Sequence, residues 1–200
     1  EGFRLRCDPD QVFPNDVRAL WSVRIEEMLR GQPAKVAGAL EVAAALGLEV
    51  DRREWVEACG RLQPAMVLKE ILDLERRLYA SSLARETETG FAFGSEQIRE
   101  AFEKLARRAG RWNVRNRQIT EMLRQQYQRP NADIEERLAY HSNLAGDVEA
   151  AVEYYYRAAL ELFRTSSLAR AIAILTEYDA VLNDELWRHQ ELRARGWLLR

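Results

Sequence analysis

Apolar residues recur at three- and four-residue spacing along most of this chain, which is the pattern of amphipathic helices with one buried face. Between Val148 and Phe163, for example, Val152, Tyr155 and Ala159 fall on a single stripe. Short turns rich in Gly, Pro, Asn, Asp and Ser separate such segments. The pattern predicts helices over residues 17–29, 36–46, 51–60, 64–79, 95–105, 114–127, 133–145, 148–163, 168–182 and 187–199.

The helical period gives way to alternation once, in two short runs at residues 82–86 and 91–93. The polar connection 87–90 joins them, and its Gly90 can adopt the positive φ that a tight hairpin demands. We therefore predict a small β-hairpin, with the two phenylalanines of its second run on the same side of the strand. Leu48–Val50 is a candidate short extended link. Helices followed by one hairpin indicate a winged-helix-like domain.

The helices after Pro130 have similar lengths and are joined by two- or three-residue turns, which is typical of antiparallel helical hairpins that stack. The expected fold is mainly all-α: a winged-helix-like domain with one β-hairpin, then tetratricopeptide-like helical hairpins. We divide the chain into a linker and connecting helix (1–33), a winged-helix-like domain with its following helix (34–130) and helical repeats (131–200).

Composition sets limits on the class of protein. Hydrophobic residues make up 47% of the 200 residues, enough to bury a core, and the formal net charge of −2 gives no global field for nucleic acid or membranes. No apolar run approaches the roughly 18 to 20 residues of a membrane span. Cys7 and Cys59 are far apart in the sequence, which favours a reducing, cytoplasmic setting over a disulfide framework. Because the first residue is Glu1 rather than Met, we expect a piece of a longer protein.

A family resemblance rests on the order of several motifs. Residues 137–159, RLAYHSNLAGDVEAAVEYYYRAA, resemble a tetratricopeptide hairpin, in which small residues let two helices approach. Before it come LEVAAALGLEVDRREWVEACG, then VLKEILDLERRLYASSLARE, then GFAFGSEQIREAF. This order resembles the C-terminal half of bacterial STAND-type signal-transduction ATPases and of related kinase- and regulator-linked ATPases. The resemblance implies a winged helix followed by tetratricopeptide-like repeats, with Pro14 to Ile25 as the helix that joins them to an ATPase core.

Motifs for catalysis are missing from the sequence. A phosphate-binding loop needs Gly followed by Lys, and no Gly in this chain is followed by Lys. His141 and His189 fall on different predicted helices, so a metal site would need carboxylates from several elements. We interpret His141 as a helix-packing or surface residue. The sequence therefore predicts no catalytic residues, no metal site and no cofactor in this chain, although the parent protein is expected to be an ATPase.

One segment, Arg99 to Arg129, is strongly basic, with nine Arg and Lys residues against three Glu. It can be interpreted as a phosphate- or acid-binding surface, or as a set of arginines that pair with acidic faces of neighbouring helices. We favour the second interpretation. Candidate partner or anion contacts, including a tyrosine that we expect to be exposed, are Arg107, Arg108, Arg111, Trp112, Arg115 and Tyr154.

The expected function follows from these observations. We interpret the chain as a non-catalytic regulatory fragment, with the winged helix as a relay and the repeats as a platform for a protein partner and for the parent's own ATPase domain. The alternative is a winged-helix DNA-binding regulator that uses the basic segment. The helix over 64–79, where a reading helix would lie, has three basic residues (Lys69, Arg76, Arg77) and three acidic ones (Glu70, Asp73, Glu75), so we do not expect nucleic acid as a partner.

Overall fold

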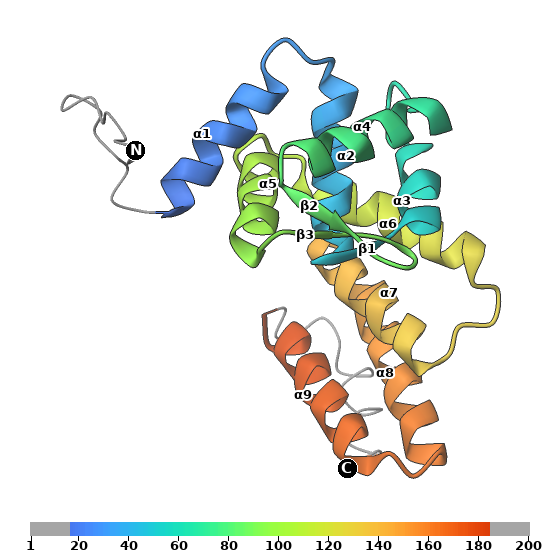
Figure 1. Cartoon of the computed structure of the whole chain (residues 1–200). Coiled ribbons are helices and arrows are strands. Elements are labelled where there is room, and N and C mark those ends of the chain that lie inside the picture. Colours follow the sequence, from blue (N-terminus) through green and yellow to red (C-terminus); the bar gives the residue numbers. More distant parts are fainter. Residues whose placement is uncertain (1–16, 185–200) are drawn as a thin grey trace, which may run out of the picture.

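The computed structural model describes residues 17–184, and this part of the chain forms nine helices and three short strands. In chain order they are α1 (Val17–Leu29), α2 (Ala34–Leu46), β1 (Glu49–Asp51), α3 (Arg52–Cys59), α4 (Leu68–Ala80), β2 (Ala84–Glu86), β3 (Gly90–Phe93), α5 (Glu96–Arg108), α6 (Trp112–Gln126), α7 (Ala132–Leu144), α8 (Val148–Arg164) and α9 (Leu168–Asp184). Helices α1 to α6 surround the small sheet, and α7, α8 and α9 extend away from them (Figure 1). The predicted mainly helical fold with a small β element is confirmed. No helix within residues 17–184 has both the length and the apolar character that crossing a membrane requires.

The sheet is larger than the single hairpin that the sequence predicts. Its three strands are antiparallel in the order β1–β3–β2, with Val50 of β1 and Glu86 of β2 on opposite sides of Phe91. The segment that we expected to be an extended link therefore contributes a strand. It does so because β3 would otherwise leave one row of backbone groups unpaired, and the backbone N–H of Phe93, for example, donates to the Leu48 carbonyl at 2.9 Å.

Gly90 belongs to strand β3 rather than to the turn, which corrects the sequence prediction. Its φ lies outside the positive range. Instead, a Cβ at this position would lie 2.2 Å from the carbonyl oxygen of Val50 and 2.7 Å from the backbone nitrogen of Arg52. Glycine is required here because the backbones of β1 and β3 approach closely.

A chain of aromatic rings joins the sheet to the helices around it. Trp55 of α3 lies 5.1 Å from Phe91, Phe91 lies 5.5 Å from Phe93, and Phe93 lies 5.7 Å from Phe102 of α5, between ring centroids. All four side chains are buried, and the indole N–H of Trp55 donates to the carbonyl of Ala39 at 2.8 Å. The alternation of the strand thus places Phe91 and Phe93 where the sequence predicts.

Helix α4 begins at Leu68, four residues later than the helix that we predicted from Pro64. The intervening loop folds back on α3, burying Leu62 and Met66, and the backbone N–H of Met66 donates to the carbonyl of Cys59 at 3.3 Å. The carboxylate of Glu70 accepts a hydrogen bond from the backbone N–H of Val67, so α4 is capped from within its own first turn. Burial of the loop's apolar side chains therefore outweighs the start signal that proline gives.

Helices α7, α8 and α9 form a second apolar core in which small residues lie at the helix contacts. Ala139, Ala151 and Ala158 are completely buried. The predicted apolar stripes included Phe163, Leu168 and Ile172, and they are wrong at these three positions, because the side chains are 53%, 54% and 65% exposed. Residues next to them in the helical turn, such as Leu162 and Ala171, face the core instead. The predicted helix over 187–199 lies outside the described residues.

Candidate functional site

Two buried carboxylates join the helices around the small sheet to α6 and α7, and the first of them is Glu41 of α2. It is fully buried and accepts hydrogen bonds from Arg111, through both Nε and Nη2, and from Arg115, through Nε at 2.9 Å. The hydrogen bonds to Glu41 raise the pKa of Arg111, although its partial burial opposes this shift. Because both arginines lie at the start of α6, Glu41 fixes that end of α6 against α2.

The second carboxylate is Glu54 of α3, which is 5% exposed. It accepts a bidentate pair of hydrogen bonds from Arg137 of α7, at 2.8 and 2.5 Å, and a third from the hydroxyl of Tyr127 at 2.9 Å. The hydrogen bonds to Glu54 raise the pKa of Arg137. Tyr127 follows α6 directly, so a single carboxylate ties α3 to the segment after α6 and to α7.

His141 of α7 lies beside these contacts and is 3% exposed. Its Nδ1 lies 2.9 Å from Oδ1 of Asn116 in α6. Burial, with a smaller contribution from the charge of Arg137, lowers the pKa of His141 to about 3. The imidazole is therefore neutral near pH 7, and its Nδ1–H donates to Asn116. This position agrees with our interpretation of His141 as a packing residue.

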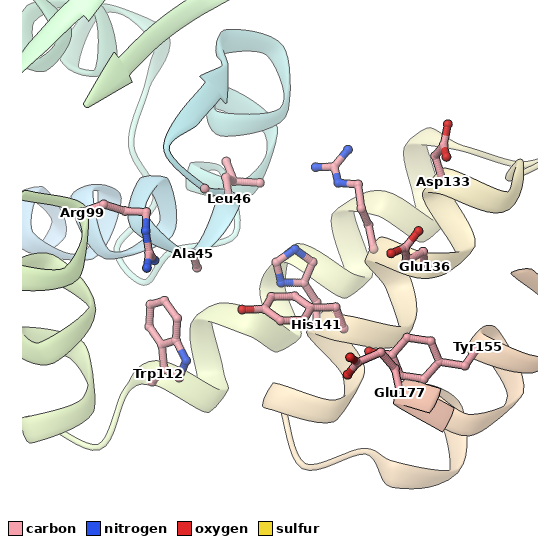
Figure 2. Close-up of a pocket in the computed structure, with 12 residues that line it drawn as sticks. Ala45, Leu46, Arg99, Trp112, Asp133, Glu136, His141, Tyr155 and Glu177 are labelled. Carbon is pink, nitrogen blue, oxygen red and sulfur yellow. The ribbon is translucent and has the colours of Figure 1, made fainter. Parts of the chain in front are cut away.

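A cleft of about 630 Å³ opens along this junction. This volume falls within the roughly 300 to 1,000 Å³ of ordinary ligand pockets. Its walls come from six helices and the loop after α2, and the residues are Ala45, Leu46, Gly47, Arg99, Trp112, Asp133, Glu136, Arg137, Tyr140, His141, Tyr155 and Glu177. Figure 2 shows Arg99 and Trp112 on one side, Glu136, Tyr155 and Glu177 on the other, and His141 between them. A second cavity of about 400 Å³ adjoins it and shares Leu46 and Arg137.

The two cavities together are acidic. Two arginines and six carboxylates line them, the carboxylates being Glu49, Asp51, Glu54, Asp133, Glu136 and Glu177. Both arginines are already engaged, Arg99 with carboxylates of its own helix and Arg137 with Glu54. Most of the carboxylates are engaged as well: Asp51 caps α3, and Glu49, Glu54, Asp133 and Glu136 pair with arginines. The remaining carboxylate, Glu177, forms no ion pair within residues 17–184, so the free charge of the cleft is negative.

Trp112 brings a hydrogen-bond donor to the wall of the cleft. Its side chain is 6% exposed, and its indole Nε1–H has no acceptor among the described residues. The nitrogen edge of the ring is turned toward the side on which His141 lies (Figure 2). Buried N–H groups are nearly always paired in folded proteins, so a buried donor without a protein acceptor at a cleft indicates a place for an external acceptor.

The structure separates the site residues that the sequence suggested. Arg111 and Arg115 are bound to Glu41, which is the internal pairing that we favoured. Arg107 pairs with Glu103 of its own helix and lies over the ring of Trp112 at 5.1 Å. Of these candidates only Trp112 lines the cleft.

The two remaining candidates behave differently from each other. Arg108 is exposed and forms no ion pair within residues 17–184. Tyr154, which we expected to be exposed, is half-buried: it packs against both apolar cores, and Arg157 lies over its ring at 5.7 Å. Tyr154 is covered because it lies where the two cores meet, a position that helix periodicity alone does not reveal.

Sequence reasoning missed Glu41, Glu54, Glu136 and Glu177. Glu41 gave a signal, since it is the one acidic residue in the otherwise apolar stretch Val36–Leu46. A charge at such a position is buried and must have a partner. The others are ordinary polar positions on amphipathic helices, and only the fold brings them together.

The wall of the cleft is built mainly from ionisable and aromatic side chains. Its wall contains no serine or cysteine in the part of the chain described, and the one histidine there is held by Asn116. Within residues 17–184, no group of three or more His, Cys, Asp and Glu side chains could hold a metal ion. Comparisons of the chain with family models, with curated proteins and with solved structures gave no match.

Proposed function

We propose that this chain is a non-catalytic regulatory and protein-interaction fragment of a larger, cytoplasmic signal-transducing ATPase. In this proposal the winged-helix-like part relays a conformational signal, and helices α7 to α9 bind a protein partner. The parent's ATPase domain is its second partner. The ATPase connection rests on the family resemblance of the sequence.

The ion pair between Glu54 and Arg137 supports the proposed relay. A buried, bidentate pair is sensitive to small displacements because its hydrogen bonds are directional and its charges are costly to separate. A movement of α3 therefore acts directly on α7, whose far side packs on α8. This contact gives a physical route from one part of the fold to the other.

A hydrogen-exchange experiment tests the relay. Glu54→Gln removes the charge but keeps the shape, so it weakens a charge-assisted contact that typically contributes about 1.5 to 3 kcal/mol. We expect exchange of protected amides in α7 and α8 to accelerate by about tenfold or more. The matched control is Glu57→Gln, on the same helix, where the carboxylate is 57% exposed and pairs only with Arg61. If acceleration stays confined to α3, the relay is wrong.

The alternative function, a DNA-binding regulator, has one observation in its favour. Four exposed arginines of the basic segment form no ion pair in the described part of the chain: Arg108, Arg117, Arg124 and Arg129. The other five cations of that segment pair with carboxylates. On α4, where a reading helix would lie, Arg76 pairs with Asp73 and Glu70 pairs with Lys35.

We expect the protein to bind a DNA duplex no more tightly than the ordinary non-specific range of about 10⁻⁴ to 10⁻⁶ M at physiological salt. The measurement is fluorescence anisotropy with a labelled duplex across a series of salt concentrations. Changing Arg107 and Arg111 together to Ala should lower stability, because Arg111 holds Glu41, rather than flatten a salt dependence. A sequence-selective complex at nanomolar concentration, lost in this variant while the fold is intact, would establish the alternative.

A further inference from the structure

We propose that the cleft between α2, α7 and α9 binds an extended protein segment that carries a basic side chain, with Glu136 and Glu177 facing the cation and the indole N–H of Trp112 donating to a backbone carbonyl. This inference rests on the proposed function, because it takes the repeat helices to be the partner-binding surface. It adds the chemistry of the partner.

The negative charge of the cleft favours a partner with a basic side chain. Glu177 of α9 forms no ion pair within residues 17–184, and Glu136 pairs only with Arg170, which is itself exposed. Exposed pairs of this kind are weak and exchange readily with another cation. Both carboxylates line the cleft on the same side as Tyr155 (Figure 2). Their charges, after burial, help to raise the pKa of Tyr155 to about 12. They therefore act on the same small region of the cleft.

Arg170 shows that the carboxylates at this edge of the cleft bind a guanidinium group. Its guanidinium donates to Asp133 at 2.7 Å and to Glu136 at 2.9 Å. Glu177 lies seven residues further along α9, two helical turns away and on the same face. The row of carboxylates that holds one guanidinium thus continues into the cleft, where Glu177 is available for a second. Tyr140, which is 52% exposed, also lines the cleft and adds an aromatic side chain, of the kind that attracts cations.

The unpaired indole N–H of Trp112 favours a peptide over an isolated cation as the ligand. Its indole N–H lies on the opposite wall from the carboxylates and requires an acceptor, which a side-chain ammonium or guanidinium cannot supply. A backbone carbonyl is such an acceptor. One residue with a basic side chain and its neighbouring carbonyl therefore satisfies both walls of the cleft, whereas a nucleic acid would place phosphates against carboxylates.

The test uses the full chain, labelled with ¹⁵N, and a blocked peptide of eight residues in which two arginines are set among alanines. The readout is the indole N–H resonance of Trp112, assigned by its loss in Trp112→Phe. We expect this resonance to shift with saturation below about 1 mM peptide. The resonance of Trp55, whose N–H already donates to Ala39, is the internal control and should stay in place. A peptide with citrulline for arginine, which has the same shape without the charge, should bind at least about fivefold more weakly.

Variants of the protein locate the cation. Glu177→Gln should weaken binding of the arginine peptide by about three- to fivefold, the usual range for partly exposed charge pairs. Glu121→Gln makes the same change of charge on the exposed face of α6, outside the cleft, and should leave binding unchanged. Equal effects of the two variants would indicate general charge attraction and overturn the proposal.

Three other results would also overturn it: tighter binding of a matched peptide with glutamate for arginine, no shift of the Trp112 resonance, or a shift that depends on protein concentration without peptide. The last result would assign the cleft to a second copy of the chain. None of them bears on the Glu54 exchange experiment, so failure of the peptide proposal and failure of the relay are distinguishable.

Discussion

Replacing Glu41 with Ala should lower the free energy of unfolding by about 3 to 5 kcal/mol, the range for removing one partner of a buried ion pair. Glu41 is completely buried, and the variant leaves Arg115, whose side chain is 11% exposed, without its counter-charge. Arg111 is 41% exposed and can turn to water, so most of the effect comes from Arg115. Urea unfolding followed by circular dichroism measures the change.

Two further variants make this result specific. Asp73→Ala removes the partner of Arg76 in a pair whose members are 46% and 73% exposed, and it should change stability by at most about 1 kcal/mol. Glu41→Leu combined with Arg115→Met replaces the buried pair with apolar side chains and should recover much of the loss. If Glu41→Ala is as mild as Asp73→Ala, the carboxylate does not hold α6 against α2.

The sequence predicts local structure well in this protein because the signals are local. The three- and four-residue spacing identifies the helices, and the alternation of Phe91 and Phe93 places both rings in the core. The errors arise where a distant segment decides the outcome. Strand β1 exists because β3 offers it an edge, and Gly90 is needed because that partner strand comes so close.

The candidate site was harder to predict for the same reason. Arg111 and Arg115 were recognised as part of a basic segment, but their partner Glu41 is about 70 residues away in the sequence. The pattern of charges alone is compatible with a ligand-binding surface as well as with the internal pairing that we favoured. The cleft also combines Trp112 with Glu177, whose helices are separated by two others, so no motif spacing could have revealed it.

The charged segment of the sequence and the charges left unpaired in the fold point to different partners. The basic segment is conspicuous in the sequence, yet more than half of its cations pair with carboxylates within the fold. In the cleft both arginines are paired, whereas Glu177 forms no ion pair within residues 17–184. Partner class is therefore set by which charges remain unpaired after folding rather than by the most charged stretch of sequence. The ligand that we propose for the cleft is accordingly a cation.

Phe93→Ala should destabilise the protein by roughly 3 to 5 kcal/mol, because it removes a large side chain from a close-packed core. The ring is 2% exposed and packs between Phe91 and Phe102, so it links the sheet to α5. Phe163→Ala is the matched control, since the same atoms are deleted from a side chain that is 53% exposed, and its effect should stay within about 0.5 kcal/mol. Thermal and urea unfolding of both variants measure the difference. A loss below about 0.5 kcal/mol for Phe93→Ala would show that this ring does not contribute to the core and that the register of β3 is wrong.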